Sequence, residues 1–345
     1  MAEGGDAVAV TADHTAPAAR PTPPVADPTA RARQRRRQLV QKYVFVVSFL
    51  IVPMIIFLIF VVSPYLQAFY LALTNWTGYS PTFEFVGLQN FAALLGLGDF
   101  NPDRVFWAGL RNNLILLLVV PAISIAIALF FASMLNFSGS TKAGQLRGVA
   151  GSTFYRVLFF VPQVISIAAL AIMFQQVFHP GGLLNSLLRL VGVADPPSWL
   201  ADPNTALLTV VIVMVWMNVG FYMVYFSAAM ANIPRELLEA AAIDKASRFQ
   251  TFLRITLPLL RSSIIVAYIY LGVLCLDAFA IVQLMTIGPG GPNETTTVMA
   301  LSIYKSFKEQ GQFGYATAQG VVLFLITMVL AALTLRITRR EQGDL

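Results

Sequence analysis

The sequence predicts an all-α, polytopic membrane protein with six transmembrane helices. Of its 345 residues, 57% are hydrophobic and only 12% are charged, and the mean hydropathy is +0.71. A soluble domain normally carries about 25% charged residues. The deficit of charge indicates that lipid, rather than water, surrounds much of the chain.

Six apolar segments are long enough to cross a bilayer, which takes roughly 20 residues for a hydrocarbon core about 30 Å thick. No charged residue occurs in 112–141 or in 203–234. The six predicted spans are 43–66, 112–135, 156–178, 206–230, 259–285 and 316–337. They make up a transmembrane domain over residues 43–340.

The two ends of the chain lie outside this domain. Residues 1–42 form a basic tail that we expect to be disordered, since residues 1–30 are rich in Ala, Pro and Thr without apolar periodicity. The stretch "RARQRRR" directly precedes the first span, so we interpret it as an orientation signal that contacts lipid headgroups, not as a nucleic-acid site. Residues 341–345 form a short C-terminal tail.

The distribution of basic residues predicts the orientation. Lys and Arg concentrate in cytoplasmic segments of membrane proteins. With the N-terminus inside, only five of the 23 Lys and Arg residues face outward: Arg104, Arg111, Arg189, Lys305 and Lys308. We therefore expect a multi-pass membrane protein with both termini in the cytoplasm.

A charged segment interrupts the apolar sequence between the fourth and fifth spans. It reads "EAAAIDKASRFQTFLRITLP" over 239–258. Pro234 can begin a helix, "RELLEAAAI" contains strong helix formers, and a second helix follows the "DKAS" break. A helix of about nine residues is marginal alone in water. This one must therefore pack on its own bundle or dock into another protein.

The spacing within this segment resembles a known family. Glu239-Ala240-Ala241 is followed by three residues, a position that is usually glycine, nine residues, and then Ile255-x-Leu257-Pro258. This pattern resembles the EAA loop (232–258) of ABC-importer permeases. Further stretches resemble the maltose-type branch: "FVGLQNF" (85–91), "FYRVLFFVP" (154–162), "NIPRELLEAAAID" (232–244) and "GGPNETTT" (290–297). Together these similarities extend over most of residues 43–340.

The resemblance implies the fold of a type I ABC-importer permease, with a cytoplasmic coupling helix that inserts into a cleft on an ATPase subunit. The residues implied in coupling are Glu239, Ala240, Ala241, Asp244, Lys245 and Arg248. Lys245 departs from the pattern, because it stands where the glycine is expected. If the backbone there is left-handed, a residue other than glycine costs on the order of 1–2 kcal/mol. Either the turn differs in shape, or the partner supplies an acid to pair with Lys245.

Several polar residues within the spans are candidates for lining a substrate path. Asn218, Tyr222 and Tyr225 share one face of the fourth span at i, i+4 and i+7. Amides, acids and aromatic rings bind sugars, the substrates that the resemblance implies. Asp277 lies in the fifth span, where a charged residue marks a pathway by default, and Gln283 follows it. The alternatives are contacts between membrane helices for the amides and tyrosines, and an Asp277 that reaches the outer interface or a backbone donor.

No G-x-x-x-x-G-K-[ST] phosphate-binding loop occurs in the sequence. If ATP drives this protein, ATP and Mg²⁺ must bind a separate chain, and we expect no enzymatic activity, cofactor or metal site here. The resemblance implies a permease subunit of the bacterial plasma membrane that forms half of the translocation pathway of a carbohydrate importer. The importer would work by alternating access. The subunit's partners would be a second EAA-type permease, an ATPase dimer and an extracytoplasmic sugar-binding protein. The main alternative is an ion-coupled secondary transporter or channel, and a membrane enzyme is the second.

Overall fold

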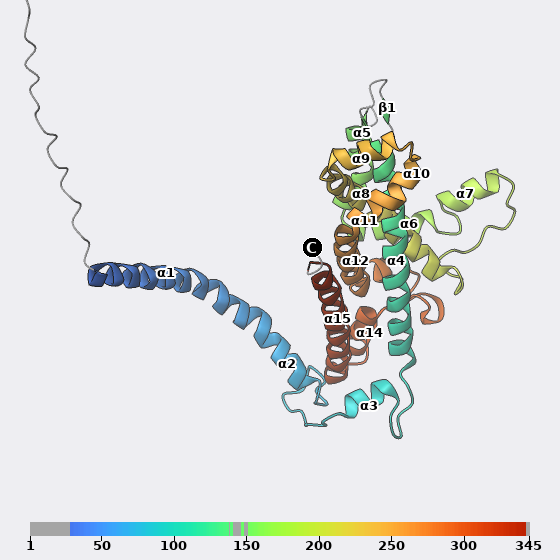
Figure 1. Ribbon diagram of the computed structural model, residues 1–345. Helices are drawn as coiled ribbons and strands as arrows, with labels where there is room; N and C mark the ends of the chain where they lie inside the picture. The colour runs from blue at the N-terminus through green and yellow to red at the C-terminus, as the bar shows by residue number, and fades with distance from the viewer. Residues whose placement is uncertain (1–27, 138, 141–145, 148–150, 343–345) are drawn as a thin grey trace, which may run out of the picture. The chain divides into compact units, whose positions relative to one another are not determined.

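The computed structural model describes residues 28–137, 139–140, 146–147 and 151–342 (Figure 1). Residues 1–27 of the tail that we expected to be disordered, and residues 343–345, lie outside the described residues. The chain divides into two units, residues 1–64 and 65–345. Each unit is described by itself.

The first unit contains α1 (Pro28–Phe57) and the π-helical turn η1 (Leu58–Val62), and α2 (Ser63–Leu71) begins at its end. Residues 28–42, which we assigned to the tail, are helical. The reason is their content of Arg, Gln and Lys, which are good helix formers and extend the helix of the apolar run.

The second unit is built around α4 (Arg104–Phe137), α8 (Ala206–Ala231) and α12 (Arg261–Leu276). The most extensive packing joins α4 to α8, and α12 also packs on α4. The core between them includes Leu116 and Val120 of α4 and Val210 and Met214 of α8. The long helix α15 (Phe313–Gln342) packs on α12 and on α14 (Met299–Lys308).

The third predicted span is broken. The residues of 156–178 fall in α5 (Ser152–Val164) and α6 (Ile167–Val177), which meet at an angle of 96°. Pro162 lacks the N–H that would bond to the carbonyl one turn earlier, and Ile165 is extended. The span predicted at 156–178 is therefore bent, and hydropathy does not register the bend because apolar residues continue through the break.

The fifth predicted span, 259–285, is also interrupted. The chain before it passes through α10 (Arg248–Thr251), the π-helical turn η2 (Phe252–Thr256) and α11 (Leu257–Leu259). It then bends by 70° into α12. Helix α12 ends at Leu276, and after Asp277 and Ala278 the chain resumes as α13 (Phe279–Met285). The segment predicted as the fifth span is therefore bent near its start and interrupted again near its end.

Four helices among the described residues are long and apolar enough to cross a membrane, and up to six spans result if each bent pair counts as one. The remaining elements are short. They are α3 (Gln89–Leu95), α7 (Leu183–Leu190), α9 (Arg235–Ile243), the 3-10 turn η3 (Pro292–Glu294), and the paired strands β1 (Gly139–Ser140) and β2 (Leu146–Arg147). Apart from this pair of two-residue strands, the described chain confirms the all-α prediction.

Candidate functional site

A cavity of about 230 Å³ lies where the two interrupted spans meet α8. Ile165 and Ile167 line it from the break between α5 and α6, and Asp277 and Ala278 line it from the break between α12 and α13. Discontinuous membrane helices commonly form binding sites, because their free ends present polar groups within the bilayer. The volume is below the roughly 300–1,000 Å³ of sites for drug-sized ligands, so the cavity suits a small solute or one ring of a larger one.

Three polar side chains line this cavity: Gln163 of α5, Asn218 of α8 and Asp277. A larger cavity of about 360 Å³ lies between α2, α14 and α15, but its walls are almost wholly apolar and aromatic, as with Phe69, Phe307 and Phe324. A site that recognises a polar solute needs a few converging polar groups. The smaller cavity is therefore the better candidate.

The break in the fifth span is held in place by Asn113, a buried residue of α4. Its Nδ2 donates to the carbonyl oxygens of Cys275 at 2.8 Å and Leu276 at 3.4 Å. Its Oδ1 accepts the backbone N–H of Met299 at 2.7 Å. Backbone groups that lose their helical partners inside a bilayer must find others. Asn113 supplies them, so the interruption beside the cavity is stabilised by tertiary structure.

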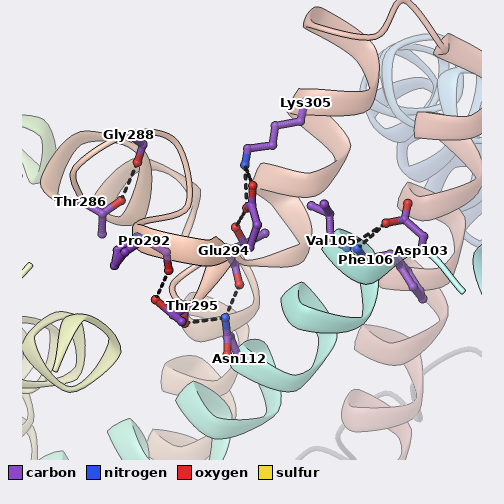
Figure 2. A network of polar contacts seen from close by, with 11 residues as sticks. Asp103, Val105, Phe106, Asn112, Thr286, Gly288, Pro292, Glu294, Thr295 and Lys305 are labelled. Carbon is purple, nitrogen blue, oxygen red and sulfur yellow. Dashed lines mark hydrogen bonds and ion pairs between the residues drawn. The ribbon is translucent and has the colours of Figure 1, made fainter. Parts of the chain in front are cut away.

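Asn112 makes a similar pair of bonds to the loop before α14 (Figure 2). Its Nδ2 donates to the carbonyl oxygens of Thr295 and Thr297, at 2.9 and 2.8 Å. Lys305 of α14 contacts both carboxylate oxygens of Glu294 in this loop at 2.6 Å (Figure 2). Adjacent amides of α4 therefore fix both the loop and the break.

The wall between α5 and α8 depends on Gly220. A Cβ on this residue would lie 1.6 Å from the carbonyl oxygen of Phe159. The two helix backbones therefore touch with no side chain between them. Gly220 lies two residues after Asn218, and Phe159 lies four residues before Gln163, so the contact sets the width of the cavity at this wall.

Of the five residues predicted to line a substrate path, the structure brings together Asn218 and Asp277. The Nδ2 of Asn218 donates to the carbonyl of Met214 in its own helix at 2.7 Å. The carboxylate of Asp277 has no hydrogen bond or ion pair with any described residue. Gln163 was not among the residues predicted to line a substrate path. A polar residue directly after a proline in an apolar run could have indicated it, because the proline breaks the helix there.

The other three predicted residues lie outside the cavity lining. Tyr222 is buried in the core beside Phe226. The Tyr225 hydroxyl donates to the carbonyl of Ser263 in α12 at 3.3 Å, which is a contact between helices. Gln283 is half-buried in α13, and its Oε1 has no partner within the described part of the chain.

The charged segment forms α9, a turn, and α10. Of the six residues implied in coupling, only Ala241 is buried, and it shares the buried face with Leu238. Glu239, Ala240, Asp244, Lys245 and Arg248 are exposed. Figure 1 shows α9 and α10 together at one end of the second unit, with α3 at the other.

The turn after α9 has the geometry that favours glycine. Lys245 has a φ of 55°. Its N–H donates to the carbonyl of Ala242 at 3.1 Å, and the N–H of Ala246 donates to that of Ala241 at 3.0 Å. These two bonds define a Schellman motif with the left-handed residue just after the helix end. The lysine therefore occupies the glycine position without changing the form of the turn.

The next helix begins with a reciprocal cap. The Ser247 hydroxyl accepts the N–H of Gln250 at 3.2 Å, and the Gln250 side chain accepts the N–H of Ser247 at 2.8 Å. This capping box and the Schellman motif satisfy the backbone at both sides of the turn. The turn therefore has a defined shape, which a docking surface requires.

Large apolar side chains are exposed on the same loop. Ile243 is 81% exposed and Phe249 is 69% exposed, and they flank the charged residues of the turn. Grouped apolar side chains on a polar surface indicate a site of protein contact. The exposed loop thus combines charges with two apolar anchors.

Comparison with known proteins identifies the family. The family of the "Binding-protein-dependent transport system inner membrane component" matches residues 136–342. The diacetylchitobiose uptake system permease protein NgcF of Streptomyces coelicolor is 41% identical over 92% of this chain and 89% of its own. The chain belongs to this family of inner membrane transport components. It is an ABC-importer permease subunit rather than an enzyme, and it is a multi-pass inner membrane protein with no cofactor of its own.

Other similarities agree with this assignment. The multiple sugar-binding transport system permease protein MsmF of Streptococcus mutans is 32% identical to this permease, over 85% of this chain and 94% of its own. A bacterial ABC transporter that imports the acidic polysaccharide alginate contains a chain with a TM-score of 0.74 and 23% identity, covering 89% of this chain and 99% of that one. This structural match confirms the predicted importer-permease fold.

Proposed function

We propose that this permease passes a carbohydrate through the cavity lined by Gln163, Asn218 and Asp277. The observation that carries the proposal is the convergence of these three polar groups where two membrane helices are broken. Amide and carboxylate groups can bond to sugar hydroxyls. Three relatives are named for the transport of carbohydrates: diacetylchitobiose, multiple sugars, and lactose in the permease protein LacF of Rhizobium radiobacter.

We further propose that a separate ATPase, which binds ATP and Mg²⁺, docks on the loop formed by α9 and α10. In this proposal the loop and both chain termini face the cytoplasm, in agreement with the distribution of Lys and Arg. The exposed Glu239 and Asp244 would meet donors on the ATPase, while Ile243 and Phe249 would enter apolar pockets. Ala240 and Arg248 would complete the contact, and Lys245 would contribute through the shape of the turn.

The loop is connected to the cavity by a continuous series of helical elements. The chain runs from α9 through α10, η2 and α11 into α12, which ends beside the cavity at Asp277. Phe252, Leu257 and Leu260 belong to one apolar cluster with Met230 of α8 and Leu271 of α12. A movement of the loop would therefore be carried into α12 by packed side chains. This arrangement supports alternating access driven by closure of an ATPase dimer.

The complete importer would contain a second EAA-type permease, two ATPase subunits and a sugar-binding protein outside the membrane. A second permease would supply the opposite wall of the pathway, which suits a cavity of only about 230 Å³. One structural relative, the alginate transporter, was crystallised in complex with its pentasaccharide-bound periplasmic protein. An equivalent delivery protein is part of the present proposal.

The test is uptake by the whole importer reconstituted in lipid vesicles with its binding protein. We expect ATP-dependent uptake of at least one mono- or disaccharide from a labelled panel, with loss of uptake when the ATPase cannot hydrolyse ATP. Replacing Asn218 by Leu should reduce uptake while leaving the complex assembled. Uptake that continues without ATP hydrolysis would overturn the proposal and favour an ion-coupled carrier.

A further inference from the structure

The cavity is lined by an acidic residue and by no basic residue. Its lining contains one acid, Asp277, and two neutral amides, Gln163 and Asn218, and none of the other lining residues is basic. Along the described chain the ion pair between Lys305 and Glu294 joins α14 to the turn η3, outside the cavity lining, and no cation pairs with Asp277. The cavity therefore carries an uncompensated carboxylate.

This carboxylate has no structural task within the described chain. The break between α12 and α13 is held by Asn113, which bonds to the carbonyls of Cys275 and Leu276. Asp277 contributes only its backbone N–H, which donates to the carbonyl of Val273 at 3.1 Å. The start of α13 beside it receives no side-chain cap, and the cap on the end of α12 comes from Asn113, not from Asp277. A charged side chain in a membrane segment is costly and is normally retained for a function.

A single charge in such a place has a strong effect on solutes. Apolar groups such as Ile165, Ile167 and Met214 form much of the surrounding wall. Asp277 itself is exposed in the isolated subunit, and the low-polarity wall beside it weakens the screening of its charge on the cavity side and focuses its field there. A negative group on the solute would meet repulsion with no cation to offset it, whereas a neutral or positive solute would not.

We propose that Asp277 makes the cavity a charge filter, which admits neutral and cationic carbohydrates and excludes anionic ones such as uronates or sugar phosphates. This proposal rests on the proposed function, since it applies to the same cavity. It adds a selection step within the membrane that is independent of the binding protein. Gln163 and Asn218 would then serve as neutral partners for hydroxyl or amide groups of the solute.

The experiment measures the electrical potential in the cavity without using the transported sugar. In the complete importer, Cys275 is replaced by Ala and a cysteine is introduced by Met217→Cys, at a cavity-lining position. The thiol is treated with two methanethiosulfonates of similar size, one carrying a trimethylammonium group and one a sulfonate. Thr82→Cys, in an exposed loop outside the cavity, is the matched control.

We expect the cationic reagent to be favoured at position 217 relative to position 82. Adding Asp277→Asn, which keeps the shape of the side chain, should lower the ratio of cationic to anionic rate at position 217 by about ten-fold. The ratio at position 82 should not change. A second readout needs no change at Asp277: the ratio at 217 should fall as salt is raised, because the Debye length shortens from about 30 Å at 0.01 M to about 3 Å at 1 M.

Two results would overturn the proposal, and they distinguish failure of the charge filter from failure of the proposed pathway. If both reagents react at position 217 with a ratio that neither Asp277→Asn nor salt alters, the charge filter is wrong and the pathway stands. If neither reagent reaches position 217 in any nucleotide state, the cavity is not open to water. In that case the pathway assignment fails, and the charge filter fails with it.

Discussion

The side chain of Asn113 lies 2.8 Å from the carbonyl oxygen of Cys275, although the two residues are 162 positions apart in the sequence. The same amide bonds to the N–H of Met299 at 2.7 Å. One buried residue of α4 therefore joins the end of α12 to the start of α14. The interruption at Asp277 exists because a distant helix supplies the bonds that the broken helix lacks.

Replacing Asn113 by Leu should destabilise the subunit. The change leaves the carbonyls of Cys275 and Leu276 and the N–H of Met299 without their side-chain partner, and each buried polar group left unpaired costs about 1–3 kcal/mol. Thermal unfolding of the purified importer, followed by size-exclusion chromatography, measures the effect. Ser133→Ala is a comparison near the other end of α4, where the side-chain hydroxyl donates to the carbonyl of Phe130 in its own helix. A melting temperature unchanged in Asn113→Leu would contradict the role of Asn113.

Replacing Lys245 by Gly should stabilise the turn after α9 by about 1 kcal/mol, because glycine adopts the left-handed conformation without strain. Lys245→Ala removes the same charge but keeps the strain, so it should not stabilise. Substrate-stimulated ATP hydrolysis should survive both changes if the docking contact depends on the shape of the turn. A loss of stimulation in both variants would instead show that the lysine contacts the ATPase directly.

Replacing Gly220 by Ala should abolish most transport. The new methyl group would overlap the carbonyl oxygen of Phe159 and force α5 away from α8. Gly320→Ala in α15 is the matched control, since a Cβ there meets nothing within 4 Å. Uptake by vesicles that contain equal amounts of assembled importer checks the result. Normal uptake in Gly220→Ala would mean that the helix contact does not shape the pathway.

Replacing Ile243 by Glu should weaken docking of the ATPase, since an apolar anchor that is 81% exposed would become a charged one. The permease itself should remain folded because the side chain packs on little of its own structure. Co-purification of the ATPase with the permease gives the readout. The control Ile243→Leu keeps an apolar side chain and should co-purify the ATPase as the unchanged permease does. Full recovery of the ATPase with Ile243→Glu would place the docking surface elsewhere.

The Lys305–Glu294 pair should show strong coupling in a double-mutant cycle. Lys305 is largely buried, and Glu294→Gln leaves its charge without a partner, which costs up to about 3 kcal/mol. The double variant Lys305→Met, Glu294→Gln removes both charges and should be less destabilised than Glu294→Gln alone. Melting temperatures of the three variants decide this. Additive effects would show that the pair is screened by solvent.

Most of the fold could be predicted from hydropathy alone. The fourth span, predicted as 206–230, is α8 to within one residue at its end, because its apolar run is uninterrupted and ends at Pro234 and Arg235. The charged loop was also predictable. Its helix formers, its "DKAS" break and its spacing all depend on local sequence, and α9 begins directly after Pro234.

The breaks could not be predicted in the same way. Apolar residues continue through Ile165 and Ala278, so hydropathy does not register the interruptions. The cause at Asp277 is the amide of Asn113, a contact that no window of sequence contains. For the same reason the helical face that carries Asn218, Tyr222 and Tyr225 was identified, but the separation of Asn218 from the two tyrosines was not. Which part of a face meets a cavity depends on the neighbouring helices.

The contact of Gly220 with Phe159 has a mechanical consequence. Two helices whose main chains touch have no compressible layer of side chains between them, so we expect them to move as one rigid unit. Asp277 and Ala278, which also line the cavity, are the two non-helical residues that join α12 to α13. We expect α5 and α8 to move together in any gating motion, while Asn113 fixes the end of α12 to α4, so that bending is left to the two non-helical residues and to α13.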